Sequence, residues 1–412
     1  MSAPSLAEPA EAQDDILERM AGRFDHHDPA LGIGVIYDVY NRLLEGPPIQ
    51  RTEAHGGFTM LTRFADVVHV SKHPEIFSSQ QDGVRHPPIA GAPRAIPAEI
   101  DRPLHNEYRR LFLNILSPPK VRDAEPFLTA LTEGLVRDYV AGPQTDFVQD
   151  VAVQLPIRAV GALVGWDIGS SDEMQHHVEV MQLNYGKPEG IEAMQALGRI
   201  AQVEIDARRA EPRGDYLTTL VNTRINGQLL TDDELQNIIR TFIFAGFETT
   251  AHMIASIMVY LAEHPKMQER IRADDEALVN FMEEAVRLFP PVHSMFRRVR
   301  KPTKIRDTQF APGDRVGMFY GAANRDPEQF DHPNDFDIDR PNIRQHLSFG
   351  FGAHLCAGSQ LARTEMTILL KILRKYPIFR LSGPPGFPPH LMGGQMMGPE
   401  HLPISFNDKV PN

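Results

Sequence analysis

The chain has 412 residues, of which 42% are hydrophobic and 23% are charged, the balance of an ordinary globular protein. Its formal net charge of −12 at pH 7 leaves no global basic field, which argues against a nucleic-acid partner. The chain contains one cysteine, which excludes an internal disulfide and any site that needs several cysteines, such as an iron–sulfur cluster.

The N-terminal segment, Met1 to Pro9, has neither a basic region nor an apolar stretch, so we expect no secretory signal. Residues 1–17 are rich in Ala, Pro and Glu, which predicts a disordered N-terminus. No later stretch resembles an interdomain linker, and we expect a single domain over residues 18–412. No run of about 18 apolar residues predicts a transmembrane helix, and the unpaired cysteine fits a reducing, cytoplasmic location.

The first part of the chain alternates short elements with a long loop. Residues 57–62 are typical of a strand, and residues around 66–70 are typical of a short helix that ends at His73-Pro74. Residues 81–97 are rich in Gly and Pro, and a long loop inside a compact domain is usually functional or disordered. A helix is expected to begin near Pro103, and on it His105 and Arg109 share one face because they are four residues apart.

The middle of the chain is predicted to be helical. A helical stretch over residues 127–209 is interrupted by Gly and Pro at 186–190. Thr231 is the expected N-cap of the next helix, which has acidic residues at 232–234 in its first turn. The apolar run after this start continues to about Glu263, which predicts a helix of roughly 30 residues and ~45 Å.

Within this long helix, the segment Ala245-Gly246-Phe247-Glu248-Thr249-Thr250 sets an acid and a hydroxyl among apolar residues. In one interpretation the helix is locally irregular and Thr249 bonds back to a preceding carbonyl. In another, Glu248 and Thr249 pass protons to a reacting group, and the two interpretations are compatible. Glu248 also has the alternative of an ion pair directed toward the surface.

The C-terminal third combines helix, strand and turn patterns. Glu284 and Arg287 are three residues apart and share a helix face, although helices contain many such pairs. A turn at residues 311–314 precedes an apolar strand at 316–320. We therefore predict a mainly α fold with small β-sheets.

The single cysteine lies in the run Phe349-Gly350-Phe351-Gly352-Ala353-His354-Leu355-Cys356-Ala357-Gly358. An isolated cysteine is usually a small buried hydrophobe. The three glycines argue against that, because glycine is needed where the backbone approaches a large flat group or takes a positive φ. A single thiolate is sufficient to ligate a haem iron.

This run resembles the haem-binding loop of the cytochrome P450 family, F-G-x-G-x-[HR]-x-C-x-G, at each of its fixed positions. The segment around Glu248 and Thr249 is similar to that family's distal-helix motif, with Glu where many bacterial members have Asp. The resemblance implies the P450 fold, in which haem b lies between a distal long helix and a proximal cysteine loop. It is strongest to soluble bacterial P450s of the camphor-hydroxylase type.

The resemblance also assigns roles to residues of this chain. It implies that Cys356 is the axial iron ligand and that Glu248 and Thr249 form the catalytic proton relay. The haem propionates are then expected to bind His105, Arg109, Arg297 and His354. Glu284 and Arg287 resemble the family's E-x-x-R pair, and the segment 336–340 supplies the third member, Arg340, of a structural ion-pair network.

A substrate pocket follows from helical steps back from Thr249 and from likeness to the family's later pocket segments. Its predicted residues are Thr241, Phe244, Ala245, Val292, His293, Met295 and Met396. Core packing is the alternative for several of them. The set is apolar and has adaptable Met side chains, which predicts a small terpenoid-like, alicyclic or aromatic substrate.

The predicted activity is that of a haem-thiolate monooxygenase, which inserts one atom of O₂ into a C–H bond. Because the chain has no flavin or nicotinamide motif and no iron–sulfur cysteines, electrons are expected from outside it. The resemblance implies that they come from a [2Fe–2S] ferredoxin with its NADH-dependent reductase. We expect a monomer. The alternatives are a peroxide-using P450, which would not need the acid and hydroxyl, and a haem-based gas sensor or carrier, which would need an output domain.

Overall fold

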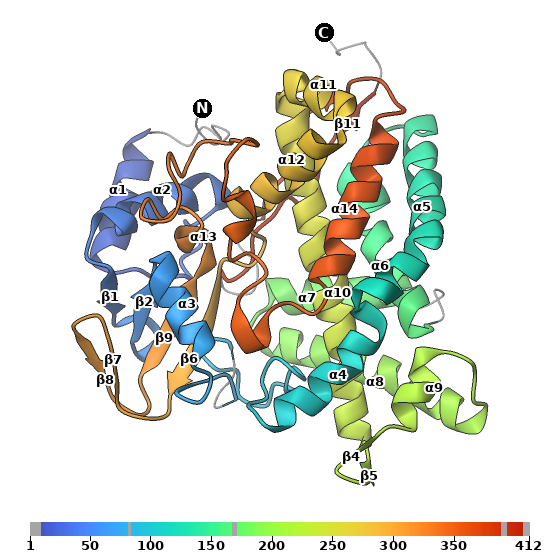
Figure 1. Cartoon of the computed structure of the whole chain (residues 1–412), viewed down its shortest axis with the longest axis horizontal. Coiled ribbons are helices and arrows are strands. Elements are labelled where there is room, and N and C mark those ends of the chain that lie inside the picture. The colour runs from blue at the N-terminus through green and yellow to red at the C-terminus, as the bar shows by residue number, and fades with distance from the viewer. Residues whose placement is uncertain (1–9, 81–83, 167–170, 389–393, 407–412) are drawn as a thin grey trace. The chain divides into compact units, whose positions relative to one another are not determined.

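The computed structural model describes residues 10–80, 84–166, 171–388 and 394–406 (Figure 1). Contacts within the chain divide it into two compact units. Unit 1 consists of Met1–Ile89, Val279–Cys356 and Phe387–Gly398. Unit 2 consists of Ala90–Leu278, Ala357–Gly386 and Pro399–Asn412. The single domain over residues 18–412 stays a prediction from the sequence.

Unit 1 is a mixed α/β unit. Its helices are α1 (Ala10–Gly22), α2 (Ile33–Glu45), η1 (Ala54–Gly56), α3 (Phe64–Lys72), most of α12 (Asp275–Leu288), α13 (Tyr320–Ala323), η4 (Ile343–Gln345) and η5 (Gly352–His354). Its strands are β1 (Ile49–Thr52), β2 (Phe58–Leu61), β3 (Phe77–Ser78), β6 (Ser294–Val299), β7 (Thr303–Ile305), β8 (Thr308–Phe310) and β9 (Arg315–Phe319). The strands predicted at 57–62 and 316–320 and the short helix before His73 are confirmed.

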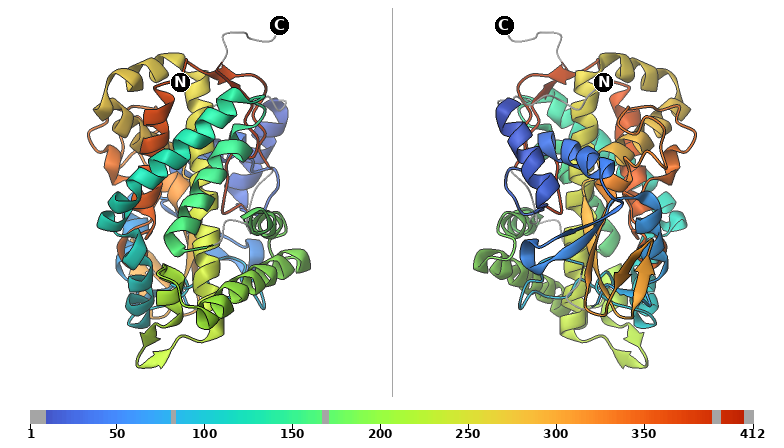
Figure 2. Two further views of the ribbon diagram at one scale, coloured as in Figure 1. Left: turned by 90° about the vertical axis from the view of Figure 1, so that its right-hand side faces the viewer. Right: turned by 90° about the vertical axis from the view of Figure 1, so that its left-hand side faces the viewer.

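The main sheet of unit 1 has the strand order β1-β2-β9-β6-β3. The β2/β9 pair is parallel, with Met60 opposite Gly317, and the other pairs in this sheet are antiparallel. Helices α1 and α2 lie beside this sheet (Figure 2, right). Successive residues of β2 and β9 point to opposite faces of the sheet, and nearly all of them are buried. Both faces of the sheet therefore belong to the core of the unit.

Helix α1 begins at Ala10, so residues 10–17 are helical where the composition predicts disorder. The reason is burial: Ile16 and Met20 are four residues apart and join the core cluster of α2 and the sheet. The average composition of residues 1–17 does not reveal that Ile16 and Met20 lie on one face of a helix. Residues 1–9 lie outside the described part of the chain.

Unit 2 is mostly helical. Its helices are α4 (Leu104–Leu116), α5 (Pro118–Ala141), the π-helix η2 (Val148–Ala152), α6 (Gln154–Val164), α7 (Ser171–Leu183), α8 (Pro188–Ala210), α9 (Tyr216–Val221), α10 (Asp232–Glu263), α11 (Pro265–Ala273) and α14 (Ser359–Leu373). Two short hairpins complete it, β4 (Arg224–Ile225) with β5 (Gln228–Leu229) and β10 (Arg380–Leu381) with β11 (Ile404–Ser405). The predicted interruption at 186–190 is confirmed by the break between α7 and α8.

Helix α10 is the long helix predicted from the sequence and has 32 residues. It starts with a capping box, in which Thr231 accepts from the backbone N–H of Glu234 and the Glu234 carboxylate accepts from the N–H of Thr231. The Tyr108 hydroxyl donates to the same carboxylate. Within unit 2, α10 packs against α6 and α8. This start is therefore fixed by local and tertiary hydrogen bonds.

Helix α10 also has the length and mean hydropathy of a helix that could cross a membrane, which the sequence analysis did not anticipate. Of its most apolar 18-residue window, 76% is buried inside the protein. The buried core helix of a soluble protein passes the same test, so this is weak evidence for a membrane span.

Candidate functional site

The loop that carries Cys356 has the backbone geometry that its glycines predict. Gly350 and Gly352 both have φ of +71°, a left-handed conformation that disfavours other residues. A Cβ on Gly352 would also collide with the carbonyl oxygen of Ser71 on α3. The loop closes where the Cys356 N–H donates to the carbonyl oxygen of Phe349, 2.8 Å away. The expected positive φ is confirmed at Gly350 and Gly352.

The surface around Cys356 fits a large, flat apolar group with a metal at its centre. Cys356 is exposed, and its neighbour Leu355 is 42% exposed. Phe351 is 38% exposed, with the Lys72 ammonium 5.6 Å from its ring centroid. A cysteine is ordinarily buried, so an exposed thiol among exposed apolar side chains marks a binding surface. The thiolate supplies a soft, anionic ligand of the kind that haem iron accepts.

The four predicted propionate ligands fall into the two units. In unit 1, Arg297 on β6 is 7% exposed and donates to the carbonyl oxygen of Phe296, and the His354 Nε2 lies 3.3 Å from the Ser79 Oγ. In unit 2, His105 and Arg109 are one turn apart on α4, as predicted. Burial, followed by the charge of Arg109, lowers the pKa of His105. That these four residues bind one haem stays a prediction.

The predicted ion-pair network of Glu284, Arg287 and Arg340 is present in unit 1. Arg287 donates to both carboxylate oxygens of Glu284, at 2.8 and 2.7 Å, and the Arg340 Nε donates to Glu284 Oε1 at 3.2 Å. Both Glu284 and Arg287 are completely buried. Burial lowers the pKa of Arg287, and Glu284 opposes that effect as its ion-pair partner.

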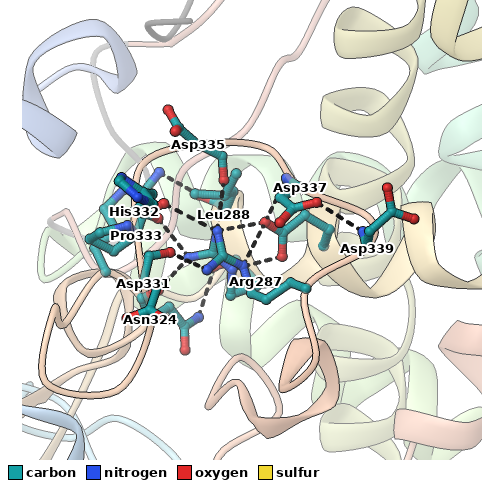
Figure 3. Close-up of polar contacts among 12 residues, drawn as sticks. Arg287, Leu288, Asn324, Asp331, His332, Pro333, Asp335, Asp337 and Asp339 are labelled. Carbon is teal, nitrogen blue, oxygen red and sulfur yellow. Dashed lines mark hydrogen bonds and ion pairs between the residues drawn. The ribbon is translucent and has the colours of Figure 1, made fainter.

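Backbone carbonyls complete this network (Figure 3). Arg287 donates to the carbonyl oxygens of Asn324 and Pro333, both at 2.7 Å, and of Asp335 at 3.1 Å. Arg340 donates to the carbonyl oxygens of Asp331, His332 and Asp335. The two guanidinium groups thus fix the irregular segment 331–340, which no strand or helix holds.

One face of α10 is accessible in the middle of the helix. Thr241, Phe244 and Thr249 are partly exposed and Ala245 is exposed, whereas Ile238, Ile239 and Ile243 are buried. Gly246 lies where α6 approaches α10, because a Cβ there would be 2.8 Å from a methyl carbon of Val160. The accessible face carries the predicted pocket residues of this helix. It is open to a ligand, and its role in binding stays a prediction.

The acid and the hydroxyl on α10 each have a contact within the helix. The Thr249 hydroxyl donates to the carbonyl oxygen of Ala245 at 3.2 Å, the back-bond that the sequence analysis considered. The segment is part of the continuous α-helix α10. Glu248 is nearly buried, and its Oε2 lies 3.3 Å from the Nε2 of His252.

Sequence reasoning missed His252. It is four residues after Glu248, the spacing that sets two side chains together on a helix, so the signal was available. The His252 Nδ1 lies 3.4 Å from the carbonyl oxygen of Pro399. Because a carbonyl oxygen accepts only, Nδ1 carries the hydrogen in this contact. The carboxylate of Glu248 thus lies beside a nearly buried imidazole.

The remaining predicted pocket residues lie in unit 1. Val292 and Met295 are partly exposed, and Met396 is buried and forms an isolated β-bridge with Val292. The prediction for His293 is wrong. Its side chain is 0% exposed and its Nδ1 lies 3.1 Å from the Tyr40 hydroxyl. Burial lowers the pKa of His293 to about 3, so it is a neutral core residue.

Comparison with known proteins decides the family. The family model for cytochrome P450 matches residues 191–397, half of the 412-residue chain.

The chain belongs to the cytochrome P450 family. It is 28% identical to the steroid C26-monooxygenase of Mycolicibacterium smegmatis over 91% of this chain and 93% of that protein. It is 29% identical to the linalool 8-monooxygenase of Pseudomonas putida, over 82% of this chain and 88% of that protein. A Mycobacterium marinum cytochrome P450 solved in complex with pseudoionone superposes with a TM-score of 0.84, at 25% identity, over 92% of this chain and 97% of that one.

The P450 fold predicted from the cysteine loop is therefore confirmed, and so is the type of enzyme. The chain is a P450 monooxygenase whose cofactor is haem b, with the thiolate of its single cysteine, Cys356, as axial ligand. The alternative of a non-enzymatic gas carrier is set aside by relatives that are named as monooxygenases.

Proposed function

We propose that this P450 hydroxylates a small apolar substrate of the terpenoid-like, alicyclic or aromatic class. The observation that carries the proposal is the accessible face of α10, where Phe244, Ala245 and the methyl groups of Thr241 and Thr249 offer apolar contacts. None of these four residues carries a charge, so a fatty-acid carboxylate would lose its hydration without a counter-charge on this face, and a sugar would find only the two threonine hydroxyls for its many polar groups.

The relatives agree with an apolar substrate. Linalool and pseudoionone, the compounds named with two of them, are small and apolar. A ligand that buries about 300 Å² of apolar surface gains roughly 7 kcal/mol. Loss of translational and rotational freedom reduces this gain, so micromolar binding is expected.

A steroid is the second candidate, because relatives at 28% identity are named as steroid C26-monooxygenases. A steroid is larger and more rigid than a monoterpenoid, and it needs a longer apolar pocket. The two candidates share the chemistry of C–H hydroxylation and differ in the size of the ligand.

In the proposed mechanism the haem, when bound, supplies the activation of O₂ for attack on a C–H bond. The chain contributes proton transfer. The carboxyl group of Glu248 is nearly buried beside His252 and takes the role of proton donor, and Thr249 presents a hydroxyl on the accessible face of α10. Such a hydroxyl accepts one hydrogen bond while it donates another, which suits it to pass protons one at a time.

Two protons delivered in this way, together with two electrons from outside the chain, convert the second oxygen atom of O₂ to water. The accessible apolar face of α10 excludes bulk water once a substrate covers it, so protons arrive by the relay and not at random. A peroxide-using P450 would not need this relay, which is why we place monooxygenation with O₂ first.

Titration of the ferric holoenzyme tests the substrate class. Binding of a substrate near the iron changes the spin state and hence the visible absorption spectrum. We expect terpenoid ketones and substituted aromatics to produce the larger shift at micromolar concentration. A shift with steroids alone selects the second candidate, and a shift with fatty acids alone contradicts the apolar, uncharged face on α10.

We also propose that this enzyme is monomeric and cytoplasmic. It receives its electrons from a [2Fe–2S] ferredoxin and that protein's NADH-dependent reductase. Arg110, Lys120 and Arg122 on α4 and α5 are exposed and offer a local basic surface despite the net charge of −12. Arg344 in unit 1 is exposed, and Arg363 on α14 is partly exposed. Arg110 is paired with Glu107, which weakens its contribution.

Charge reversal of Lys120 and Arg122 to Glu tests the docking surface. Ferredoxin-driven turnover is expected to fall and to lose its dependence on ionic strength, because surface charges act mainly on association. Turnover supported by a chemical reductant serves as the control and is expected to be unchanged. Unaltered salt dependence in the double variant would rule out this surface.

A further inference from the structure

A cluster of histidines in unit 1 plays no part in the site described above. His26 and His27 lie in a turn after α1, and His55 lies between β1 and β2. The ring centroids of His26 and His27 are 4.5 Å apart, and those of His27 and His55 are 4.4 Å apart. One ring nitrogen of each of the three residues lies within 4.8 Å of the other two. Three imidazoles from two separate segments therefore converge on one point.

We propose that His26, His27 and His55 form a binding site for a first-row divalent transition metal, with Zn²⁺ as the reference ion. Zinc takes nitrogen ligands at 2.0–2.1 Å, so tetrahedral ligand atoms are about 3.3 Å apart. The three ring nitrogens lie within 4.8 Å of one another, and the half-buried His27 and the exposed His55 have room to adjust to the tetrahedral spacing. Neutral imidazole suits Zn²⁺, Cu²⁺ and Ni²⁺, whereas Mg²⁺ and Ca²⁺ prefer oxygen ligands.

The hydrogen bonds of the three rings support the proposal. The Nε2 atoms of His26 and His27 lie 2.7 and 3.1 Å from the carbonyl oxygen of His86. A carbonyl oxygen only accepts, so each of these Nε2 atoms carries a hydrogen, and the Nδ1 of a neutral ring keeps its lone pair. The His55 Nε2 lies 2.7 Å from Asp25 Oδ1. Metal-binding histidines typically donate their second nitrogen to a carbonyl or carboxylate in this way.

Burial supplies a second, independent observation. His26 is 2% exposed, and its Nδ1 has no hydrogen-bond partner among the described residues. A buried polar nitrogen without a partner is unfavourable and rare, and a metal ion would satisfy it. The Asp25 carboxylate, next to His55, supplies negative charge that a divalent cation needs nearby.

A metal at this point would connect parts of unit 1 that are far apart in sequence. The turn after α1 is already joined to residue 86 through the carbonyl oxygen that accepts from His26 and His27, and His55 adds the β1–β2 connection. A bound metal would thus hold the turn after α1 against the rest of unit 1. A ligand that binds only the folded state raises stability with its concentration.

Calorimetric titration of the holoenzyme with Zn²⁺ tests the proposal. We expect one strong site, weakened at least about tenfold in the double variant His27→Gln/His55→Gln, and a rise in melting temperature with Zn²⁺ that the variant lacks. Both residues are partly or fully exposed, so their replacement is compatible with folding. Asp25→Asn keeps all three imidazoles and is expected to weaken binding by about 10–100-fold through lost orientation.

Two matched controls remove other histidine pairs. His176→Gln/His177→Gln changes two adjacent histidines on α7, and His69→Gln/His73→Gln changes a pair at the end of α3 and its C-cap, whose ring centroids are 4.5 Å apart. Both variants are expected to keep the strong site. Zinc-edge X-ray absorption of the loaded wild-type holoenzyme should show imidazole ligands at about 2.0–2.1 Å. Equal affinity in wild type and His27→Gln/His55→Gln, no strong site in the wild type, or loss of the site in a control variant would each overturn the proposal.

Discussion

The carboxylates of Glu284 and Glu248 are both nearly or completely buried, and their surroundings differ. Glu284 binds two guanidinium groups, and Arg287 alone makes five hydrogen bonds, two to Glu284 and three to backbone carbonyls. Glu248 has one imidazole 3.3 Å away, and the Nε2 of that imidazole makes no aligned hydrogen bond among the described residues. A network whose hydrogen bonds are complete holds a segment in place. For Glu248, which has fewer partners, we propose proton transfer instead.

The largest effect is expected from Glu284→Ala. It leaves the buried Arg287 and Arg340 without a counter-charge, at a cost of about 3–5 kcal/mol in the free energy of unfolding. We expect little haem to be incorporated, because the segment 331–340 loses its anchor. Urea unfolding and the haem-to-protein ratio measure this. A stable, fully haem-loaded Glu284→Ala protein would show that the network is not structural.

Cys356→His is expected to remove activity and leave the fold. The imidazole can ligate iron, so some haem is kept, while the thiolate-type ferrous–CO spectrum and monooxygenase activity are lost. The CO difference spectrum and the melting temperature separate these two properties. A thiolate-type spectrum in this variant would contradict Cys356 as the axial ligand.

Thr249→Ala is expected to leave stability almost unchanged, because within the described part of the chain its hydroxyl bonds only to the Ala245 carbonyl oxygen. NADH should still be consumed, with electrons diverted to peroxide since protons are no longer delivered in order. Product and peroxide formed per NADH are the measurement. Ser256→Ala removes the same kind of back-bond from the same helix and is the matched control. Equal product per NADH in Thr249→Ala and Ser256→Ala would remove Thr249 from the mechanism.

Glu365 on α14 extends the comparison to a buried carboxyl without partners. Burial raises its pKa from 4.5 to about 8, and neither of its oxygens has a hydrogen-bond partner among the described residues. The folded state therefore favours the protonated form. The contribution of protonated Glu365 to the free energy of unfolding is complete below about pH 4.5. It is lost as the pH rises toward 8, by at most about 1.4 kcal/mol per pH unit.

Glu365→Gln mimics the protonated form, so its melting temperature should exceed that of the wild type at pH 8.5 and equal it at pH 5. Thermal unfolding at the two pH values gives the comparison. An unchanged pH profile would mean that Glu365 titrates normally in the folded protein.

Much of this arrangement is readable from local sequence. Thr231 and Glu234 are three residues apart and fix the start of α10, and the glycines around Cys356 require the positive φ that Gly350 and Gly352 adopt. The E-x-x-R pair meets because its members are one helical turn apart. Arg340 could be predicted as the third member of the network only from the resemblance to a known family.

What sequence reasoning missed depends on contacts between distant segments. His293 was assigned to a pocket, and its burial comes from Tyr40 on α2, more than 250 residues away. The convergence of His26 and His55 depends on the path of a turn and a strand connection, which carries no periodic pattern. His252 is the exception. Its spacing of four residues from Glu248 can be read from the sequence, whereas its burial cannot.

The most direct test of the account is the rate of product formation by Glu248→Gln, with the compound that gives the largest spin-state shift and saturating ferredoxin. The account predicts wild-type haem content, a wild-type ferrous–CO spectrum and a rate lower by about 100-fold or more, because proton transfer is lost while the fold is kept. A wild-type rate of product formation at wild-type haem content would contradict it.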